Sequence, residues 1–250
     1  MVSGMITPAA IPLSGPRNAA SLVRTVDLKG PAGRLEALLN EGAPDAPFAA
    51  LVCHPHPLGG GTLHNKVVYH AMKVLNAPEW GLGWPVLRFN FRGTGLSEGM
   101  HDGEAESEDV LAALAWLGAE YRRPLVVVGF SFGAAMALKA VCDRVSPANR
   151  VIKAVAALGL PTHAQGRDYH YDFLSACNIP KLFLSGDRDQ FAPPGTLAQV
   201  SAAAGEPKQL AFVRDADHFF TGQIDPMQQA LAGWLKKQVL GEQVPREQVQ

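Results

Sequence analysis

One serine of this sequence stands between two glycines, where an apolar run meets a run of small helix-forming residues. The stretch Val126–Ala135 reads VVVGFSFGAA, with Ser131 between Gly129 and Gly133. A sharp turn between a strand and a helix exposes such a serine hydroxyl, and the glycines let strand and helix approach closely. The free N–H groups and positive dipole end of the helix then face whatever the serine attacks. Ser131 is therefore the predicted nucleophile, and an ordinary tight turn is the alternative.

A serine hydroxyl needs a base to take its proton and an acid to orient that base. The apolar run Leu182–Ser185 leads into a glycine turn with Asp187 and Asp189, and the run Gln209–Val213 leads to His218. Such groups gather at the carboxyl ends of parallel strands, and the chain order Ser, Asp, His is one that active sites use. We predict His218 as the base and Asp189 as its acid, because Asp187 directly follows the glycine and is better placed to bond local backbone.

Other acids and histidines are weaker candidates for these two roles. Asp215 and Asp217 are close to the predicted base in the sequence, but such neighbours rarely point at the ring nitrogen opposite the serine. His163 and His170 lie in an irregular stretch of the chain. An ordinary solvated surface position is the alternative for either predicted residue.

A loop rich in proline and glycine follows the apolar run Phe48–Cys53. It covers His54–Gly61 and reads HPHPLGGG. Acyl transfer needs two donors for the oxyanion, and one is expected to be the backbone N–H of Phe132, directly after the serine. Proline has no N–H, so the second donor must come from His56, Leu58 or the glycines. We favour Leu58, with His56 as the close alternative.

The same loop and a later irregular stretch are expected to contact the substrate. Gly59 and Gly60 let the backbone approach a ligand closely. The stretch Pro161–Asn178 is long enough for a small flap with one short helix, and its expected contact residues are Tyr169, Tyr171 and Phe173.

A metal site is the alternative use of the histidines in the proline-rich loop. It would combine His54, His56 and His64 with Cys53. The prolines stiffen the pair, and no second cluster completes a tetrahedral set at familiar spacing. We therefore expect no metal.

Composition limits the partners. The 250 residues carry 22 Lys and Arg against 23 Asp and Glu, with no basic block, so nucleic acid is not an expected partner. No apolar run approaches the length of a membrane span, so no membrane partner is expected. Three cysteines, Cys53, Cys142 and Cys177, show no close pairing pattern. That pattern fits a reducing compartment and argues against a disulfide framework. Residues 1–20 lack a basic start followed by an apolar block, so no signal peptide is predicted and a cytoplasmic protein is expected.

Apolar patterning predicts strands that alternate with helices. Strands are expected at Leu22–Leu28, Arg34–Asn40, Phe48–Cys53, Trp84–Phe89, Leu125–Phe130, Val151–Leu158, Leu182–Ser185 and Gln209–Val213. Helices are expected at His64–Leu75, Glu104–Tyr121, Phe132–Cys142, Thr196–Ala203 and Pro226–Leu240. This alternation predicts an α/β fold with a mostly parallel sheet of about eight strands, covered on both faces, and an antiparallel first hairpin. We expect a single domain over residues 21–240, a flexible leader at 1–20 and a flexible tail at 241–250.

Taken together, the motifs resemble the α/β-hydrolase superfamily over roughly Leu22–Leu240. The resembling pieces are Gly129–Gly133, Gly186–Asp189, Asp217–His218 and Arg92–Ser97. The HPHPLGGG stretch, with Asn65–Val68 after it and Phe89–Gly93 later, is similar to small uncapped bacterial hydrolases described as carboxylesterases, near the dienelactone-hydrolase-like and peptidase-like branches. The resemblance implies an eight-stranded sheet, a Ser131–His218–Asp189 triad, and no metal or organic cofactor.

The sequence departs from the family where many members carry a cap domain. Only Pro161–Asn178 is available between the sixth and seventh strands, so we expect an open site suited to short or accessible acyl groups. The expected function is hydrolysis of a small-molecule carboxylic ester through an acyl-enzyme, by a monomer or homodimer. A thioesterase, peptidase, lactonase or acyltransferase would use the same residues, and a non-catalytic binding protein is the alternative from another class.

Overall fold

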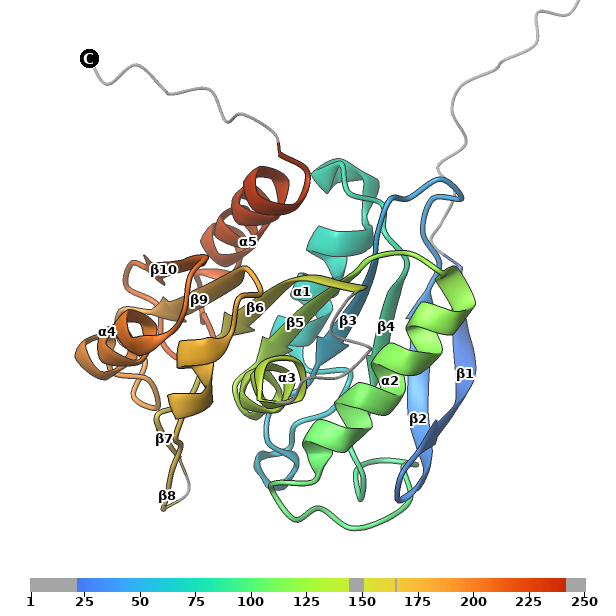
Figure 1. Cartoon of the computed structure of the whole chain (residues 1–250), viewed down its shortest axis with the longest axis horizontal. Helices are drawn as coiled ribbons and strands as arrows, with labels where there is room; N and C mark the ends of the chain where they lie inside the picture. Colours follow the sequence, from blue (N-terminus) through green and yellow to red (C-terminus); the bar gives the residue numbers. More distant parts are fainter. Residues whose placement is uncertain (1–21, 144–150, 165, 242–250) are drawn as a thin grey trace, which may run out of the picture.

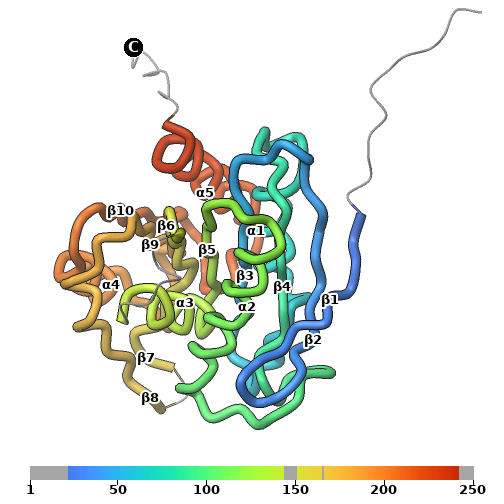
Figure 2. The backbone as a smooth tube through the Cα atoms, turned by 45° about the vertical axis from the view of Figure 1, so that its right-hand side comes forward, coloured from blue at the N-terminus to red at the C-terminus, as the bar shows by residue number. Residues whose placement is uncertain are grey.

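An eight-stranded sheet forms the centre of the computed structural model, which describes residues 22–143, 151–164 and 166–241 (Figure 1). Its strands are β1 (Val23–Gly30), β2 (Gly33–Asn40), β3 (Ala49–Cys53), β4 (Val86–Phe89), β5 (Leu125–Phe130), β6 (Ile152–Leu158), β9 (Lys181–Gly186) and β10 (Lys208–Val213). They lie in the order β1-β2-β4-β3-β5-β6-β9-β10. Figure 2 shows the β1–β2 hairpin at one edge of this sheet and β10 toward the other. The predicted α/β-hydrolase fold class is confirmed.

The strands are parallel except at the first hairpin. β2 pairs antiparallel with both β1 and β4, whereas the remaining neighbours pair parallel. Cys53 lies opposite Gly129, and Val213 lies opposite Gly186, so neighbouring strands end at matching levels. The loops after β3, β5, β9 and β10 consequently meet at one edge of the sheet, which is where the predicted site residues lie in the sequence.

Helices cover both faces of the sheet. Helices α2 (Glu106–Tyr121) and α3 (Phe132–Cys142) pack against each other and against one face, whereas α1 (Lys66–Asn76) and α5 (Ile224–Val239) pack together on the other. Helix α4 (Pro194–Ala203) packs on β9 and β10. Side chains of β5 alternate between the two cores: Val127 contributes to one and Val126 and Val128 to the other. A strand buried on both faces therefore reads as a continuous apolar run.

Two helices begin where local capping chemistry, not apolar spacing, sets the boundary. The helix predicted from His64 begins at Lys66, because the Asn65 side chain accepts a hydrogen bond from the Val67 N–H and caps it. Helix α4 begins at Pro194, two residues before its predicted start, and proline is favoured in the first turn. The predicted leader, residues 1–20, lies outside the described residues, as does the predicted tail beyond residue 241.

The stretch Pro161–Asn178 contains more structure than the single short helix expected from the sequence. It holds a small hairpin, β7 (His163–Ala164) with β8 (Arg167–Asp168), and then the 3₁₀-helix η4 (Asp172–Ala176). Two further 3₁₀-helices are η1 (Pro57–Gly59) and η2 (Pro78–Trp80).

A disulfide joins Cys142 at the end of α3 to Cys177 just after η4. The three cysteines were expected to form no disulfide framework, and this bond between two of them corrects that expectation. The two cysteines are 35 residues apart in the sequence, and the fold brings their Cα atoms to 5.1 Å. The third cysteine, Cys53, is free and buried.

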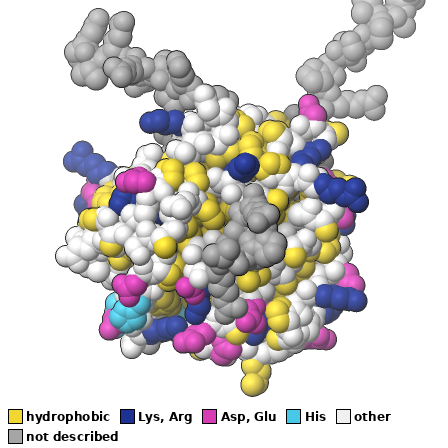
Figure 3. Space-filling view, in the orientation of Figure 1, with side chains coloured by type: hydrophobic (Ala, Val, Ile, Leu, Met, Phe, Trp, Pro, Cys, Tyr) yellow, Lys and Arg dark blue, Asp and Glu magenta, His cyan; other side chains and the backbone are white. Residues whose placement is uncertain are grey.

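The surface carries mixed charge. On the face shown in Figure 3, Lys and Arg side chains are scattered between Asp and Glu side chains. Among the helices of the described residues, none has the length and apolar character that crossing a bilayer requires.

Candidate active site

Ser131 occupies a backbone conformation that few residues other than glycine adopt. It is the N-cap of α3, with φ 55° and ψ −122°. Its N–H donates to the Leu158 carbonyl at 2.8 Å, which ties the turn to β6. A Cβ on Gly129 would overlap the Gly133 carbonyl and the Ala134 backbone, so the glycine is required for the close approach of strand and helix.

The structure brings three predicted residues into one hydrogen-bonded series. Ser131 Oγ lies 2.9 Å from His218 Nε2, and His218 Nδ1 lies 2.9 and 3.0 Å from the two carboxylate oxygens of Asp189. The three side chains come from the loops after β5, β10 and β9. Each is at most 9% exposed, so the series is shielded from bulk water. This arrangement can pass a proton from the serine to an imidazole whose other nitrogen is held by a carboxylate.

The Asp189 carboxylate is held by more than the histidine. It accepts hydrogen bonds from Ser185 Oγ at 2.7 Å and from the N–H groups of Phe191 and Ala192 at 2.8 and 3.1 Å. Burial alone would raise the pKa of Asp189, but the hydrogen bonds from His218 and Ser185 outweigh it, and the pKa lies below its ordinary value. Asp189 therefore stays ionised opposite His218.

The alternative acids and histidines lie elsewhere. Asp187 is exposed, and Asp215 forms an ion pair with Arg188 at the surface. Asp217 accepts from the N–H groups of Phe219 and Thr221, which shapes the loop that carries His218. His163 and His170 are both exposed, and His163 pairs with Asp168.

The proline-rich loop places His56, not Leu58, beside the serine. Leu58 is 77% exposed, and its N–H donates to His56 Nδ1 at 3.2 Å, so that N–H already has an acceptor. The His56 ring packs against the Phe132 ring at 4.9 Å between centroids. Among the described residues, the backbone N–H groups of His56 and Phe132 have no acceptor. The geometry thus favours His56 over the predicted Leu58 as the second oxyanion donor.

The loop histidines are engaged in ways that do not suit a metal. His54 Nδ1 lies 2.6 Å from the Pro55 carbonyl, and His54 Nε2 accepts from the Phe91 N–H at 2.9 Å. Burial lowers the pKa of His54 to about 4, so the ring is neutral and braces the loop. Burial and the nearby His101 likewise lower the pKa of His56 to about 4. Within the described ranges, no three His, Cys, Asp or Glu side chains gather as a metal site would require.

A cavity of about 110 Å³ lies in front of the serine. Its lining residues are Pro55, His56, Gly59, Asn65, Ser131, Phe132, Ala164, Tyr169, Phe191, His218 and Phe219. A larger cavity of about 580 Å³, between the loop after β2 and η2, contains none of the predicted site residues.

The predicted substrate contacts divide into two groups. Gly59 and Tyr169 line the cavity, whereas Gly60, Tyr171 and Phe173 do not. Tyr171 is buried, its hydroxyl donates to the Pro161 carbonyl at 2.6 Å, and the Phe173 ring packs against it. These two aromatic side chains therefore contribute to the packing of the Pro161–Asn178 flap and not to the cavity lining.

Sequence reasoning missed several residues around the cavity. Phe191 lies two residues after the predicted acid and Phe219 directly follows the predicted base, and their rings pack against His218 at 4.7 and 5.1 Å. Their nearness in the sequence to those two residues was the available signal. Asn65 also lines the cavity, and in the sequence it stands out only within the Asn65–Val68 stretch that resembles the hydrolase family.

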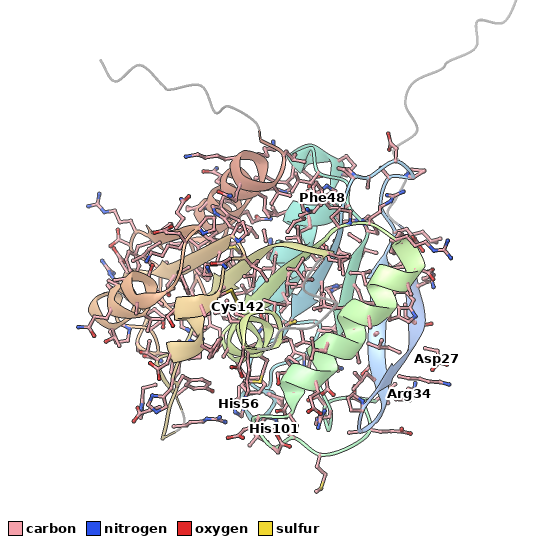
Figure 4. The ribbon with its side chains drawn as sticks, in the orientation of Figure 1. Asp27, Arg34, Phe48, His56, His101 and Cys142 are labelled. Atoms are coloured by element: carbon pink, nitrogen blue, oxygen red, sulfur yellow. A yellow bond between two sulfur atoms is a disulfide. The ribbon has the colours of Figure 1, made fainter. Side chains whose placement is uncertain are left out.

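A partly buried histidine, His101, and a buried glutamate, Glu106, lie behind the proline-rich loop and had no sequence signal. The His101 ring contacts the rings of His56 at 4.7 Å and Phe132 at 5.5 Å, and Figure 4 shows His56 and His101 beside each other. His101 Nδ1 lies 2.5 Å from Glu106 Oε1, a distance suited to an ion pair although the angle is poor for a hydrogen bond. The His101 ring thus packs against the side chains of both His56 and Phe132.

Comparisons with known proteins agree with this fold. The sequence profile of the family described as "Alpha/beta hydrolase domain" matches residues 61–231. An uncharacterized protein, RP471, from Rickettsia prowazekii is 35% identical over 217 residues, which span 82% of this chain and 86% of that protein.

Two solved structures are similar over most of the chain. The crystal structure of XC6422 from Xanthomonas campestris, a serine hydrolase without a lid, is 31% identical, with a TM-score of 0.73, and the match covers 86% of this chain and 94% of that one. A serine hydrolase homologue from Coxiella burnetii is 30% identical, also with a TM-score of 0.73, and the match covers 85% of this chain and 97% of that one. The chain described here therefore belongs to the α/β-hydrolase family, and residues 22–143, 151–164 and 166–241 include no cap domain.

Proposed function

We propose that this hydrolase is a serine esterase that cleaves carboxylic esters through an acyl-enzyme intermediate. The observation that carries the proposal is the unbroken series from Ser131 Oγ through His218 to Asp189, which opens on a cavity lined by His56 and Phe132. The backbone N–H groups of these two residues have no acceptor in the part of the chain that the structure describes. The likeness to a serine hydrolase without a lid supports it further.

In the first half of the proposed reaction, Ser131 Oγ attacks the ester carbonyl carbon while His218 Nε2 takes its proton. The carbonyl oxygen gains negative charge, and the N–H groups of Phe132 and His56 donate to it. The tetrahedral intermediate then expels the alcohol, which receives the proton from His218. Ser131 is left carrying the acyl group.

In the second half, water replaces the alcohol. His218 takes a proton from the water as its oxygen attacks the acyl carbon, and Ser131 leaves with that proton. Asp189 holds His218 in the tautomer that has its proton on Nδ1 and stabilises the imidazolium formed in each half. The lowered pKa of Asp189 keeps it charged for this role.

The size of the cavity supports a small substrate. A volume of about 110 Å³ is well below the range of roughly 300–1,000 Å³ typical of sites for drug-sized ligands. Esters with short acyl groups fit this space, whereas a long acyl chain would have to extend over the surface.

Hydrolysis of a panel of short p-nitrophenyl esters tests the proposal. Wild-type protein is expected to hydrolyse p-nitrophenyl acetate, and Ser131→Ala is expected to lose that turnover while keeping its melting temperature. Equal turnover by both proteins would refute the serine mechanism. Thioester, amide and lactone substrates in the same panel separate the esterase from thioesterase, peptidase and lactonase activities, and added alcohols or amines detect acyl transfer.

The partner, the oligomeric state and the cellular location of the enzyme are likewise proposals. We infer a small-molecule ester as its partner, a monomer or homodimer as its assembly and the cytoplasm as its location. Light scattering after size-exclusion chromatography measures the assembly. Cell fractionation measures the location, and thiol labelling of Cys142 and Cys177 in the cell reports whether their disulfide forms there.

A further inference from the structure

Two side chains of the cavity carry polar groups that the protein leaves unused. Tyr169 lines the cavity, and its hydroxyl makes no hydrogen bond with a described residue. Asn65 also lines the cavity, and its Oδ1 accepts from the Val67 N–H at 2.9 Å, which identifies the oxygen of the amide. The Asn65 Nδ2 group is then the free end, and it donates to no described residue. Neither group is among the buried polar atoms that lack a partner, so both keep contact with solvent.

The Tyr169 ring is held in place from outside the cavity. The Arg167 guanidinium lies over the ring, 5.3 Å from its centroid, and Arg167 Nη1 donates to the Gly103 carbonyl at 2.7 Å. The Tyr171 ring is nearly parallel to it, at 6.4 Å and 12°. The hydroxyl of Tyr169 is therefore preorganised, and less entropy is lost when a ligand binds it.

The remaining lining favours a neutral ligand. Phe132, Phe191, Phe219 and Ala164 supply apolar surface, and no Asp, Glu, Lys or Arg is among the lining residues of this cavity. A charged substrate group would lose hydration here without gaining a partner. Burial raises the pKa of Tyr169, which keeps its hydroxyl protonated and able to donate.

We propose that the substrate is a short, neutral ester with an ether, carbonyl or hydroxyl oxygen a few bonds from the scissile carbonyl, and that the Tyr169 hydroxyl and the Asn65 amide donate hydrogen bonds to that oxygen. This inference rests on the esterase activity proposed above and narrows its substrate class. Tyr169 and Asn65 are specificity-determining residues in this account, and neither takes part in proton transfer.

Isosteric ester pairs test the proposal. On the acyl side, p-nitrophenyl methoxyacetate is compared with p-nitrophenyl butyrate; on the alcohol side, 2-methoxyethyl acetate is compared with butyl acetate. In each pair one CH₂ is replaced by an ether oxygen. The measured quantity is the ratio of kcat/KM for the oxygen-containing ester to that for its hydrocarbon partner. Dividing the variant's ratio by the wild-type ratio cancels the different intrinsic reactivity of the two esters.

Three variants complete the design. Tyr169→Phe removes only the hydroxyl, and Asn65→Asp removes the N–H donors but keeps an oxygen to cap α1. Each is expected to lower the ratio about 2- to 10-fold in at least one pair, the range for losing a neutral hydrogen bond. The control is Tyr171→Phe, whose hydroxyl is already bonded to the Pro161 carbonyl outside the cavity and whose ratio should not change.

The outcomes are distinct. Unchanged ratios for both Tyr169→Phe and Asn65→Asp in both pairs, with turnover retained, would overturn the inference and leave the esterase proposal standing. If one of these variants does not fold, the other decides. Wild-type protein that hydrolyses none of the four esters would overturn the esterase proposal and this inference together.

Discussion

Replacing Asp189 by asparagine changes the charge and donor pattern behind His218 without changing the shape of the side chain. In the wild-type protein, the Asp189 carboxylate accepts from His218 Nδ1, from Ser185 Oγ and from two backbone N–H groups. The backbone N–H groups of Phe191 and Ala192 hold one oxygen, so an asparagine would keep its Oδ1 there. Its NH₂ group would then face His218 Nδ1.

The expected loss follows from that reversed hydrogen bond. When the asparagine NH₂ group donates to His218 Nδ1, the proton of the neutral imidazole must lie on Nε2. Nε2 then has no lone pair to accept the proton of Ser131. The substitution also removes the negative charge that stabilises the imidazolium. In Ser-His-Asp triads this change lowers kcat about 10⁴-fold. That factor corresponds to about 5 kcal/mol of transition-state stabilisation.

Initial rates with p-nitrophenyl acetate, measured beside the melting temperature, check this prediction. The matched control is Asp187→Asn, which alters an exposed carboxylate two residues away and should keep wild-type kcat. Folded Asp189→Asn protein with more than a tenth of wild-type kcat would refute the role assigned to Asp189. A comparable loss in Asp187→Asn would show that the effect is not specific to the residue bonded to His218.

Three further predictions concern stability. Because burial lowers the pKa of His54 to about 4 while the unfolded value is about 6.5, the unfolded state binds the extra proton first. His54 should therefore contribute about 2–3 kcal/mol to the fall in the free energy of unfolding between pH 7 and pH 4.5, and His56, whose pKa is also lowered to about 4, adds to that fall. Urea titrations at the two pH values measure the fall, and a His54→Gln variant with the same pH dependence as the wild-type protein would contradict the contribution of His54. Breaking the disulfide by a double Cys142→Ser and Cys177→Ser substitution should cost about 3–4 kcal/mol for its 35-residue separation, and an unchanged urea midpoint would count against it. Gly133→Ala should prevent folding or destabilise the protein strongly, because its Cβ would overlap the His54 and Cys53 carbonyls. Gly233→Ala in α5 has open space around its Cβ and should raise the melting temperature, because alanine is favoured over glycine in a helix by about 1 kcal/mol. Equal melting temperatures of the two variants would refute this contrast.

The elements that could be predicted from the sequence are those whose signal is local. The boundaries of β5 and α3 agree with the prediction residue for residue, because the glycines and the serine mark the junction between them. The acid and base could be proposed because each follows an apolar run, and parallel strands end at a common edge. The structure then brings Ser131, His218 and Asp189 within hydrogen-bond distance.

The features that could not be predicted depend on contacts between distant segments. Tyr169, Tyr171 and Phe173 alternate in the sequence, and nothing local distinguishes the one that lines the cavity from the two that pack beneath it. No spacing rule reports that the Leu58 N–H donates to the His56 side chain, which is why the sequence alone favours Leu58 over His56. The bond between Cys142 and Cys177 arises from the packing of η4 near the end of α3, so residue counting missed it.

Covalent labelling with a fluorophosphonate tests the central claim most directly, because the reagent reacts with a serine only when a base has activated it. Intact-mass spectrometry of the wild-type protein should show one adduct, and peptide mapping should locate it on Ser131. His218→Ala, which lacks the proposed base, and Ser131→Ala should both remain unlabelled while folded. An unlabelled wild-type protein, or an adduct on any other serine, would contradict the account of this site.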